Sequence, residues 1–142
     1  MSVALRVAAP EEHAALMRLR HEVFCVEQGV PVELEQDAND AAAIHLVAVD
    51  GDEVIGTCRL VPGGDSWTLG RMAVRADRRA DGVGRDLLEH AHEQARNGGA
   101  HRVTLSAQVP VQGFYGRQGY ISEGGVFMDA GIPHIRMRRE LT

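Results

Sequence analysis

Three short strands joined by tight turns, then a glycine-containing turn and a helix, constrain this fold most. The segments at 44–50 (IHLVAVD) and 53–61 (EVIGTCRLV), separated only by Gly51 and Asp52, predict a β-hairpin. WTLGRMAV at 67–74 predicts a third strand. Strands with such short connections run antiparallel. A doubly wound parallel fold is therefore excluded.

The rest of the chain alternates between helix and strand patterns. We expect a strand at 3–8, a helix from Pro10 to about residue 26, and a loop or short broken helix at 27–40. After the third strand we expect a helix that ends at the Asn-Gly-Gly of 97–99. The remaining predicted elements are a strand at 101–107, a short helix at 110–119 and strands at 120–128 and 134–141. This order predicts one domain, 1–142, of α/β class with a mixed, mostly antiparallel sheet flanked by helices.

Composition limits the partners. The 15 Lys and Arg against 20 Asp and Glu give a net charge of −5, which argues against nucleic acid as the main partner. No apolar run approaches the length of a membrane span, and the N-terminal apolar run is too short for a signal peptide.

Cys25 and Cys58 form no CxxC pair, and we expect two reduced, buried thiols and a cytoplasmic location. No metal site is predicted, because His90 and His92 lie about 200° apart around their helix.

The stretch RRADGVGRDLLEHAHEQA at 78–95 opens the long helix with two glycines. The first N–H groups of a helix have no internal partner and favour an anion, and glycines let a bulky phosphate approach. A pyrophosphate suits this geometry, and a ligand-free turn explains the glycines as well. The spacing matches neither a P-loop nor a three-glycine dinucleotide fingerprint. Asp81 puts a carboxylate beside the proposed phosphate: it either caps the helix with its side chain turned away or faces the ligand and weakens binding, and Arg78, Arg79 and Arg85 can offset its charge.

Five ordered blocks extend this pattern along the chain: RLRHEVFCVEQGVP (18–31), GRMAV (70–74), LSAQ (105–108), FYGRQGY (114–120) and FMDAGIPHIRM (127–137). Together with R-x-x-G-x-G at 79–84 they resemble the GNAT N-acetyltransferases, in particular an ElaA-like bacterial branch. The resemblance implies a single GNAT domain whose curved sheet splays between its fourth and fifth strands, with acetyl-CoA in the gap. It implies no metal.

The resemblance also implies a cofactor site. Backbone groups of Met72, Ala73 and Val74 would contact the pantetheine arm, which pairs with a splayed strand as an added strand would. A second set of residues would bind the pyrophosphate and make the remaining contacts to the cofactor: Arg79, Gly82, Val83, Gly84, Arg85, Gln108 and Phe114.

The chemistry suggests further roles. The N–H of Val74 can stabilise the oxyanion. Tyr115 matches the family's general-acid tyrosine, and a tyrosine that only packs is the alternative. Full proton transfer from a phenol of pKa about 10 to a thiolate of pKa about 8.5 is uphill by roughly 2 kcal/mol. A hydrogen bond from Tyr115 to the leaving thiolate is therefore the expectation.

An amine acceptor is protonated at neutral pH, so a general base should help. The candidates are Glu27, Glu33 and His134, and a histidine that only orients its loop is the alternative for His134. Glu27, Gln28 and Glu33 are expected to line the acceptor site, and a solvated helix end is the alternative for Glu27 and Gln28. The acidic residues of 27–40 favour a small amine or polyamine, unless they simply solvate a loop.

We therefore predict an acetyl-CoA-dependent N-acetyltransferase that moves the acetyl group directly to a primary amine in a ternary complex. The alternatives are a non-catalytic acyl-CoA sensor and a phosphate-binding protein unrelated to coenzyme A. A homodimer in which the strand at 134–141 adds to a neighbour's sheet is a further hypothesis.

Overall fold

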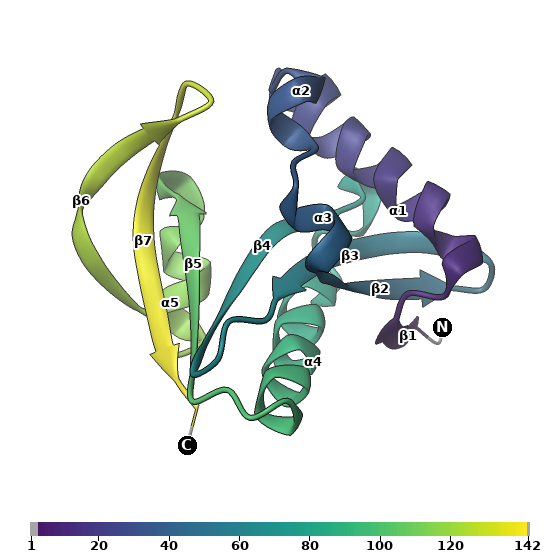
Figure 1. Cartoon of the computed structure of the whole chain (residues 1–142). Coiled ribbons are helices and arrows are strands. Elements are labelled where there is room, and N and C mark those ends of the chain that lie inside the picture. The colour runs from purple at the N-terminus through teal and green to yellow at the C-terminus, as the bar shows by residue number, and fades with distance from the viewer. Residues whose placement is uncertain (1–2, 142) are drawn as a thin grey trace.

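A seven-stranded sheet in the order β1-β2-β3-β4-β5-β7-β6 organises the chain in the computed structural model, which describes residues 3–141 (Figure 1). The elements follow the order that the sequence predicts. The strands are β1 (Val3–Val7), β2 (Ile44–Asp50), β3 (Glu53–Val61), β4 (Ser66–Val74), β5 (Arg102–Gln108), β6 (Ile121–Asp129) and β7 (Ile132–Glu140). The helices are α1 (His13–Arg20), α2 (Val32–Glu35), α3 (Asn39–Ala42), α4 (Val83–Asn97) and α5 (Gln112–Arg117), with single turns η1 (Pro10–Glu12), η3 (Ala76–Arg78) and η4 (Val109–Val111) and the π-helical η2 (His21–Glu27).

The sheet is mixed and mostly antiparallel. Strands β1 to β4 form an antiparallel meander, and β5, β7 and β6 form a second antiparallel group. The two groups meet in one parallel pair, β4 with β5, which is limited to 66–68 opposite 102–104. Beyond these residues the two strands separate, as the diverging arrows in Figure 1 show. The predicted splay between the fourth and fifth strands is confirmed.

Helices cover both faces of the meander. Alternate residues of β2 point to opposite faces, as strand geometry requires. Leu46 and Ala48 belong to the large core cluster that includes Leu87 of α4, whereas Val47 packs with Leu16 of α1 on the other face. The meander, which forms one side of the opened gap, is thereby packed on both faces.

Helix α4 lies unusually close to β3. A Cβ at Gly56 would come within 2.8 Å of Val83 Cγ1 and 2.9 Å of Leu87 Cδ1, so glycine is required there. The helix ends at Gly98, after 15 residues. No helix within residues 3–141 is both long and apolar enough to cross a membrane.

Two expectations need correction. Strand β7 lies between β5 and β6 with both edges paired, so it cannot add to a neighbour's sheet; the free edge of that group belongs to β6. Cys58 is buried, but Cys25, on η2, is partly exposed. The helix from Pro10 to Glu27 is continuous but changes from 3₁₀ to α to π winding.

Candidate active site

The separation of β4 from β5 opens a cavity of about 940 Å³. Its walls come from the facing halves of the two strands, from the start of α4, from α5, from η2 and α2, and from the β6–β7 turn. In Figure 1 the α2 segment and the tip of the β6–β7 hairpin face each other across the top of this gap. Elements from the whole length of the chain therefore converge on one space.

A bulge in β4 aims its backbone at the cavity. Arg71 has φ +52°, and the pairing with β3 loses register between Thr57 and Arg59. After the bulge, Arg75 N donates to Ile55 O at 2.8 Å, which makes Val74 and Gly56 a non-hydrogen-bonded pair. The N–H of Val74 consequently points away from β3, toward the opened side of the strand.

The turn before α4 leaves its first amides without partners. Gly82 is the N-cap with φ +79°, and no side chain caps the helix. The first intrahelical bond shown for this turn runs from Asp86 N to Gly82 O at 3.1 Å. The N–H groups of residues 83–85 find no acceptor among residues 3–141, so they are available to an anion.

Asp81 does not cap the helix. Its carboxylate accepts a hydrogen bond from Arg78 Nε at 2.7 Å, because that guanidinium lies one turn back on the same segment. Arg79 and Arg85 both line the cavity beside the turn. A neutralised acid and two cationic side chains thus surround the free amides.

Tyr115 lines the cavity from α5 and is only 7% exposed. Its ring packs edge-on against Phe114 and Tyr120. Burial raises the pKa of Tyr115 well above its ordinary value. The phenol therefore keeps its proton, and can donate a hydrogen bond without readily releasing the proton.

His134 lines the same cavity from β7. Its Nδ1 lies 2.7 Å from the carbonyl oxygen of Ile132, and a carbonyl can only accept. Nδ1 therefore carries the hydrogen, and in the neutral ring Nε2 keeps a free lone pair. Phe127 stacks on the imidazole, with the ring centroids 5.9 Å apart, and fixes its plane.

Two side-chain contacts join the C-terminal end of η2 to the other side of the cavity. Arg79 Nη2 lies 2.8 Å from Glu27 Oε1, and the same arginine donates from Nε to Val74 O at 3.0 Å. Gln108 Nε2, at the end of β5, donates to Gln28 Oε1 at 2.8 Å. The carboxylate of Glu27 is thus already occupied by a guanidinium.

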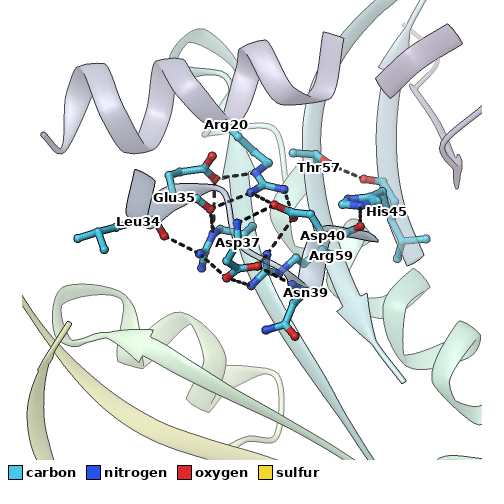
Figure 2. A network of polar contacts seen from close by, with 11 residues as sticks. Arg20, Leu34, Glu35, Asp37, Asn39, Asp40, His45, Thr57 and Arg59 are labelled. Atoms are coloured by element: carbon cyan, nitrogen blue, oxygen red, sulfur yellow. Dashed lines mark hydrogen bonds and ion pairs between the residues drawn. The ribbon is translucent and has the colours of Figure 1, made fainter. Parts of the chain in front are cut away.

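A network of arginines and acids lies under the α2 end of the cavity (Figure 2). Each of three arginines contacts two acids: the pairs are Arg20 with Glu35 and Asp40, Arg59 with Asp37 and Asp40, and Arg71 with Glu35 and Asp37. Burial alone would raise the pKa of Asp40, but hydrogen bonds from Arg20 and Arg59 outweigh it and hold that pKa below its ordinary range.

Sequence reasoning missed this network. The contacts of this network join residues 15 to 36 positions apart, which no local periodicity reveals. The one available signal was the density of acids at 33–40 in a chain with several internal arginines. His45 belongs to its margin, where Nε2 contacts Asp40 O at 2.9 Å.

Most of the residues singled out from the sequence line the cavity together, and four do not. Ala73 is buried against Leu19 and Val23, and the side chain of Val83 belongs to the core, which leaves only its amide for a ligand. Glu27 and Glu33 lie outside the lining. The lining set comprises Gln28, Met72, Val74, Arg79, Gly82, Gly84, Arg85, Gln108, Phe114, Tyr115 and His134.

Metal ligation has no support in the described part of the chain. No three His, Cys, Asp or Glu side chains within residues 3–141 come together in a way that could hold a metal ion.

The splayed sheet, the free helix amides and the buried tyrosine are the features expected of an acyl-CoA-dependent acyltransferase. The chain belongs to the GNAT acetyltransferase family, whose domain profile matches residues 6–141. It is similar to the uncharacterized N-acetyltransferase YjcF of Bacillus subtilis strain 168, with 35% identity over 123 residues that cover 86% of this chain and 88% of YjcF.

ElaA of Escherichia coli K12 is 32% identical over 133 residues, 89% of this chain and 86% of ElaA. The crystal structure of an acyl-CoA N-acyltransferase from Pseudomonas aeruginosa superposes with a TM-score of 0.85 at 32% identity and covers 97% of this chain and 98% of its own. The protein is therefore an N-acetyltransferase of the ElaA-like branch, and GNAT enzymes take acetyl-CoA as their acetyl donor.

Proposed function

We propose that this enzyme transfers an acetyl group from acetyl-CoA directly to a primary amine on a small molecule, within a ternary complex. The observation that carries the proposal is the single cavity between β4 and β5, into which the free helix amides, Val74, Tyr115 and His134 all open. Donor and acceptor can meet there without a covalent enzyme intermediate.

Acetyl-CoA fits the free groups of this cavity. The pyrophosphate would bind the amides of 83–85 with help from Arg79 and Arg85. A Cβ at position 84 would lie 3.5 Å from Phe114 Cζ and 3.8 Å from Val74 Cγ2, so glycine keeps this corner open for the cofactor. The pantetheine arm would run between β4 and β5, past Met72 and Gln108.

Two groups would stabilise the reacting thioester. The Val74 N–H on the open side of β4 can donate to the developing oxyanion, and the loss of one such donor typically costs about 10²–10³ in kcat. The protonated Tyr115 can donate to the leaving thiolate. Because its pKa is raised, we assign it a hydrogen bond rather than complete proton transfer.

His134 is the better placed general base. Its Nε2 lone pair is free, whereas the carboxylate of Glu27 is held by Arg79. Glu27 could take this role only when Arg79 turns to a phosphate. Gln28, Glu27 and Glu33 belong to the η2–α2 side that we assign to the acceptor.

We also keep two broader proposals. The two free cysteines favour a reducing, cytoplasmic location.

A homodimer would use the free edge of β6, where Ile121, Val126 and Met128 are more than half exposed. Light scattering on the purified protein distinguishes monomer from dimer.

The test is acetyl-CoA-dependent thiol release with a panel of small amines. Wild-type protein should acetylate at least one amine, and Tyr115→Phe should lower kcat by about 10²-fold with little change in acetyl-CoA affinity. Tyr120→Phe, a neighbouring buried tyrosine outside the cavity lining, is the matched control and should keep kcat within a few-fold. Equal kcat in Tyr115→Phe and wild type would contradict the assignment of Tyr115.

A further inference from the structure

The acids near the acceptor side are already neutralised. Glu35 accepts from Arg20 Nε at 2.7 Å, and Asp37 accepts from both terminal nitrogens of Arg59 at 2.7 and 2.9 Å. Asp40 accepts from Arg20 and Arg59. Each of these three carboxylates is therefore paired with a guanidinium. The acids are not free to attract a cationic polyamine, as the sequence suggested they would.

Arg71 has the longest ion-pair contacts of this network, at 3.5 Å from Nε to Glu35 Oε2 and 3.2 Å from Nη2 to Asp37 Oδ2. It donates from Nε to Glu35 O at 3.0 Å and from Nη2 to Leu34 O at 3.3 Å and Asp37 Oδ2 at 3.2 Å. Its Nη1 has no acceptor among residues 3–141. By contrast, Arg20 donates from all three nitrogens and is 1% exposed.

Arg71 is also open to a ligand. Its side chain is 25% exposed and lines the cavity. Burial first, and the nearby Arg59 guanidinium second, lower the pKa of Arg71, as an incompletely compensated cation requires. The β4 bulge places Arg71 three residues before Val74, on the strand that would hold the thioester.

We infer that the acceptor carries a carboxylate as well as its amine, as an amino acid does, and that Arg71 Nη1 binds this carboxylate while the amine reaches the thioester beside Val74. A guanidinium is the side chain best suited to a carboxylate. This inference rests on the proposed acetyl transfer, and it replaces a cationic acceptor by a zwitterionic one.

The first experiment compares amines that differ by one carboxylate: lysine with cadaverine, ornithine with putrescine, and tyrosine with tyramine. With wild-type enzyme and acetyl-CoA, the carboxylate-bearing member should have at least a tenfold higher kcat/KM in every pair that reacts, since a hydrogen bond to a charged group is worth roughly that factor or more. Preference for the decarboxylated member would overturn the inference.

If no pair of amines reacts, a binding experiment tests the inference instead. Calorimetric titration of CoA-loaded protein with the same pairs should detect only the carboxylate-bearing members, and binding by none of them would also overturn the inference. Failure of the protein to bind acetyl-CoA itself would instead overturn the proposed function, so the two failures are distinguishable.

Arg71→Gln separates recognition from structure. Arg71 also anchors the α2 backbone, so a loosened segment would weaken both members of a pair alike. The inference predicts that the ratio of kcat/KM between the two members falls at least tenfold, with Arg71→Lys intermediate and acetyl-CoA affinity within twofold of wild type. An unchanged ratio would overturn it.

Discussion

Arg79 Nη2 contacts Glu27 Oε1 at 2.8 Å, and this ion pair joins the proposed phosphate site to the proposed acceptor wall. The two residues are 52 positions apart and both side chains are more than a third exposed. A phosphate that recruits Arg79 must compete with Glu27 for it. Occupancy by the cofactor and the position of η2 are thereby coupled.

Glu27→Gln should tighten acetyl-CoA binding. An exposed ion pair is worth about 0.2–1 kcal/mol, so freeing Arg79 should lower the Kd by up to about fivefold. With His134 as base, kcat should stay within a few-fold of wild type. Calorimetry and steady-state kinetics measure both quantities. A loss of 10²-fold or more in kcat would identify Glu27 as the base instead.

Gly82→Ala should weaken both the fold and the cofactor site. A side chain at φ +79° costs about 1–2 kcal/mol, and the new Cβ would lie 3.2 Å from Arg85 Nη2. We expect a lower Tm and weaker acetyl-CoA binding. Gly124→Ala is the control, because it carries the same strain at φ +72° in β6, with nothing within 4 Å. Both variants should lose stability, but only Gly82→Ala should lose affinity.

Arg20→Met should destabilise the protein strongly. It leaves the carboxylate of Glu35, 3% exposed, without its main partner, and breaking a buried pair costs about 3–5 kcal/mol. Denaturant unfolding measures the loss. Arg102→Met, which breaks an exposed pair with Glu140, is the matched control and should cost no more than about 1 kcal/mol. Similar losses in the two variants would show that the network in Figure 2 contributes little.

His92 makes stability pH-dependent. Arg139 Nη1 donates to Nδ1 at 3.0 Å, so Nε2 carries the hydrogen and donates to Tyr120 Oη at 2.7 Å. Burial, helped by Arg139, lowers the pKa of His92 to about 4. The unfolded chain then binds more protons between pH 6.5 and 4, so this contribution is present above pH 6.5 and is lost as the pH falls.

At pH 5 the loss amounts to about 2 kcal/mol, or roughly 5–8 °C in Tm. His92→Gln keeps a polar side chain without this titration, so its Tm should fall less between pH 8 and pH 5 than that of the wild type. Parallel Tm profiles for the two proteins would contradict the assignment.

The sequence predicted the fold where the signals are local. The Gly51-Asp52 turn predicted the hairpin, and the apolar face of 83–95 predicted α4, because turn chemistry and periodicity act over a few residues. The interior position of β7 could not be read in this way, since strand order depends on how separate segments pair.

In the site, too, residues within local motifs could be predicted from the sequence, whereas contacts between distant residues could not. Gly82 and Tyr115 lie within recognisable motifs, and both line the cavity. Arg71 lies in GRMAV, but its bulge depends on the pairing with β3 and its bonds to α2 reach partners 36 and 37 positions away. For Asp81 the sequence left open a helix cap and a charge offset by arginines, and only the structure shows that Arg78 pairs with it.

The most direct measurement is calorimetric titration of wild-type protein and Gly84→Leu with acetyl-CoA. A leucine at position 84 would extend into the cavity toward Phe114 and Val74. The account predicts saturable one-to-one binding to the wild type, weaker binding of 3′,5′-ADP and of pantetheine alone, and at least a hundredfold loss in Gly84→Leu with Tm preserved. Absence of binding to the wild type at millimolar acetyl-CoA, or equal binding by the two proteins, would contradict a cofactor site between β4 and β5.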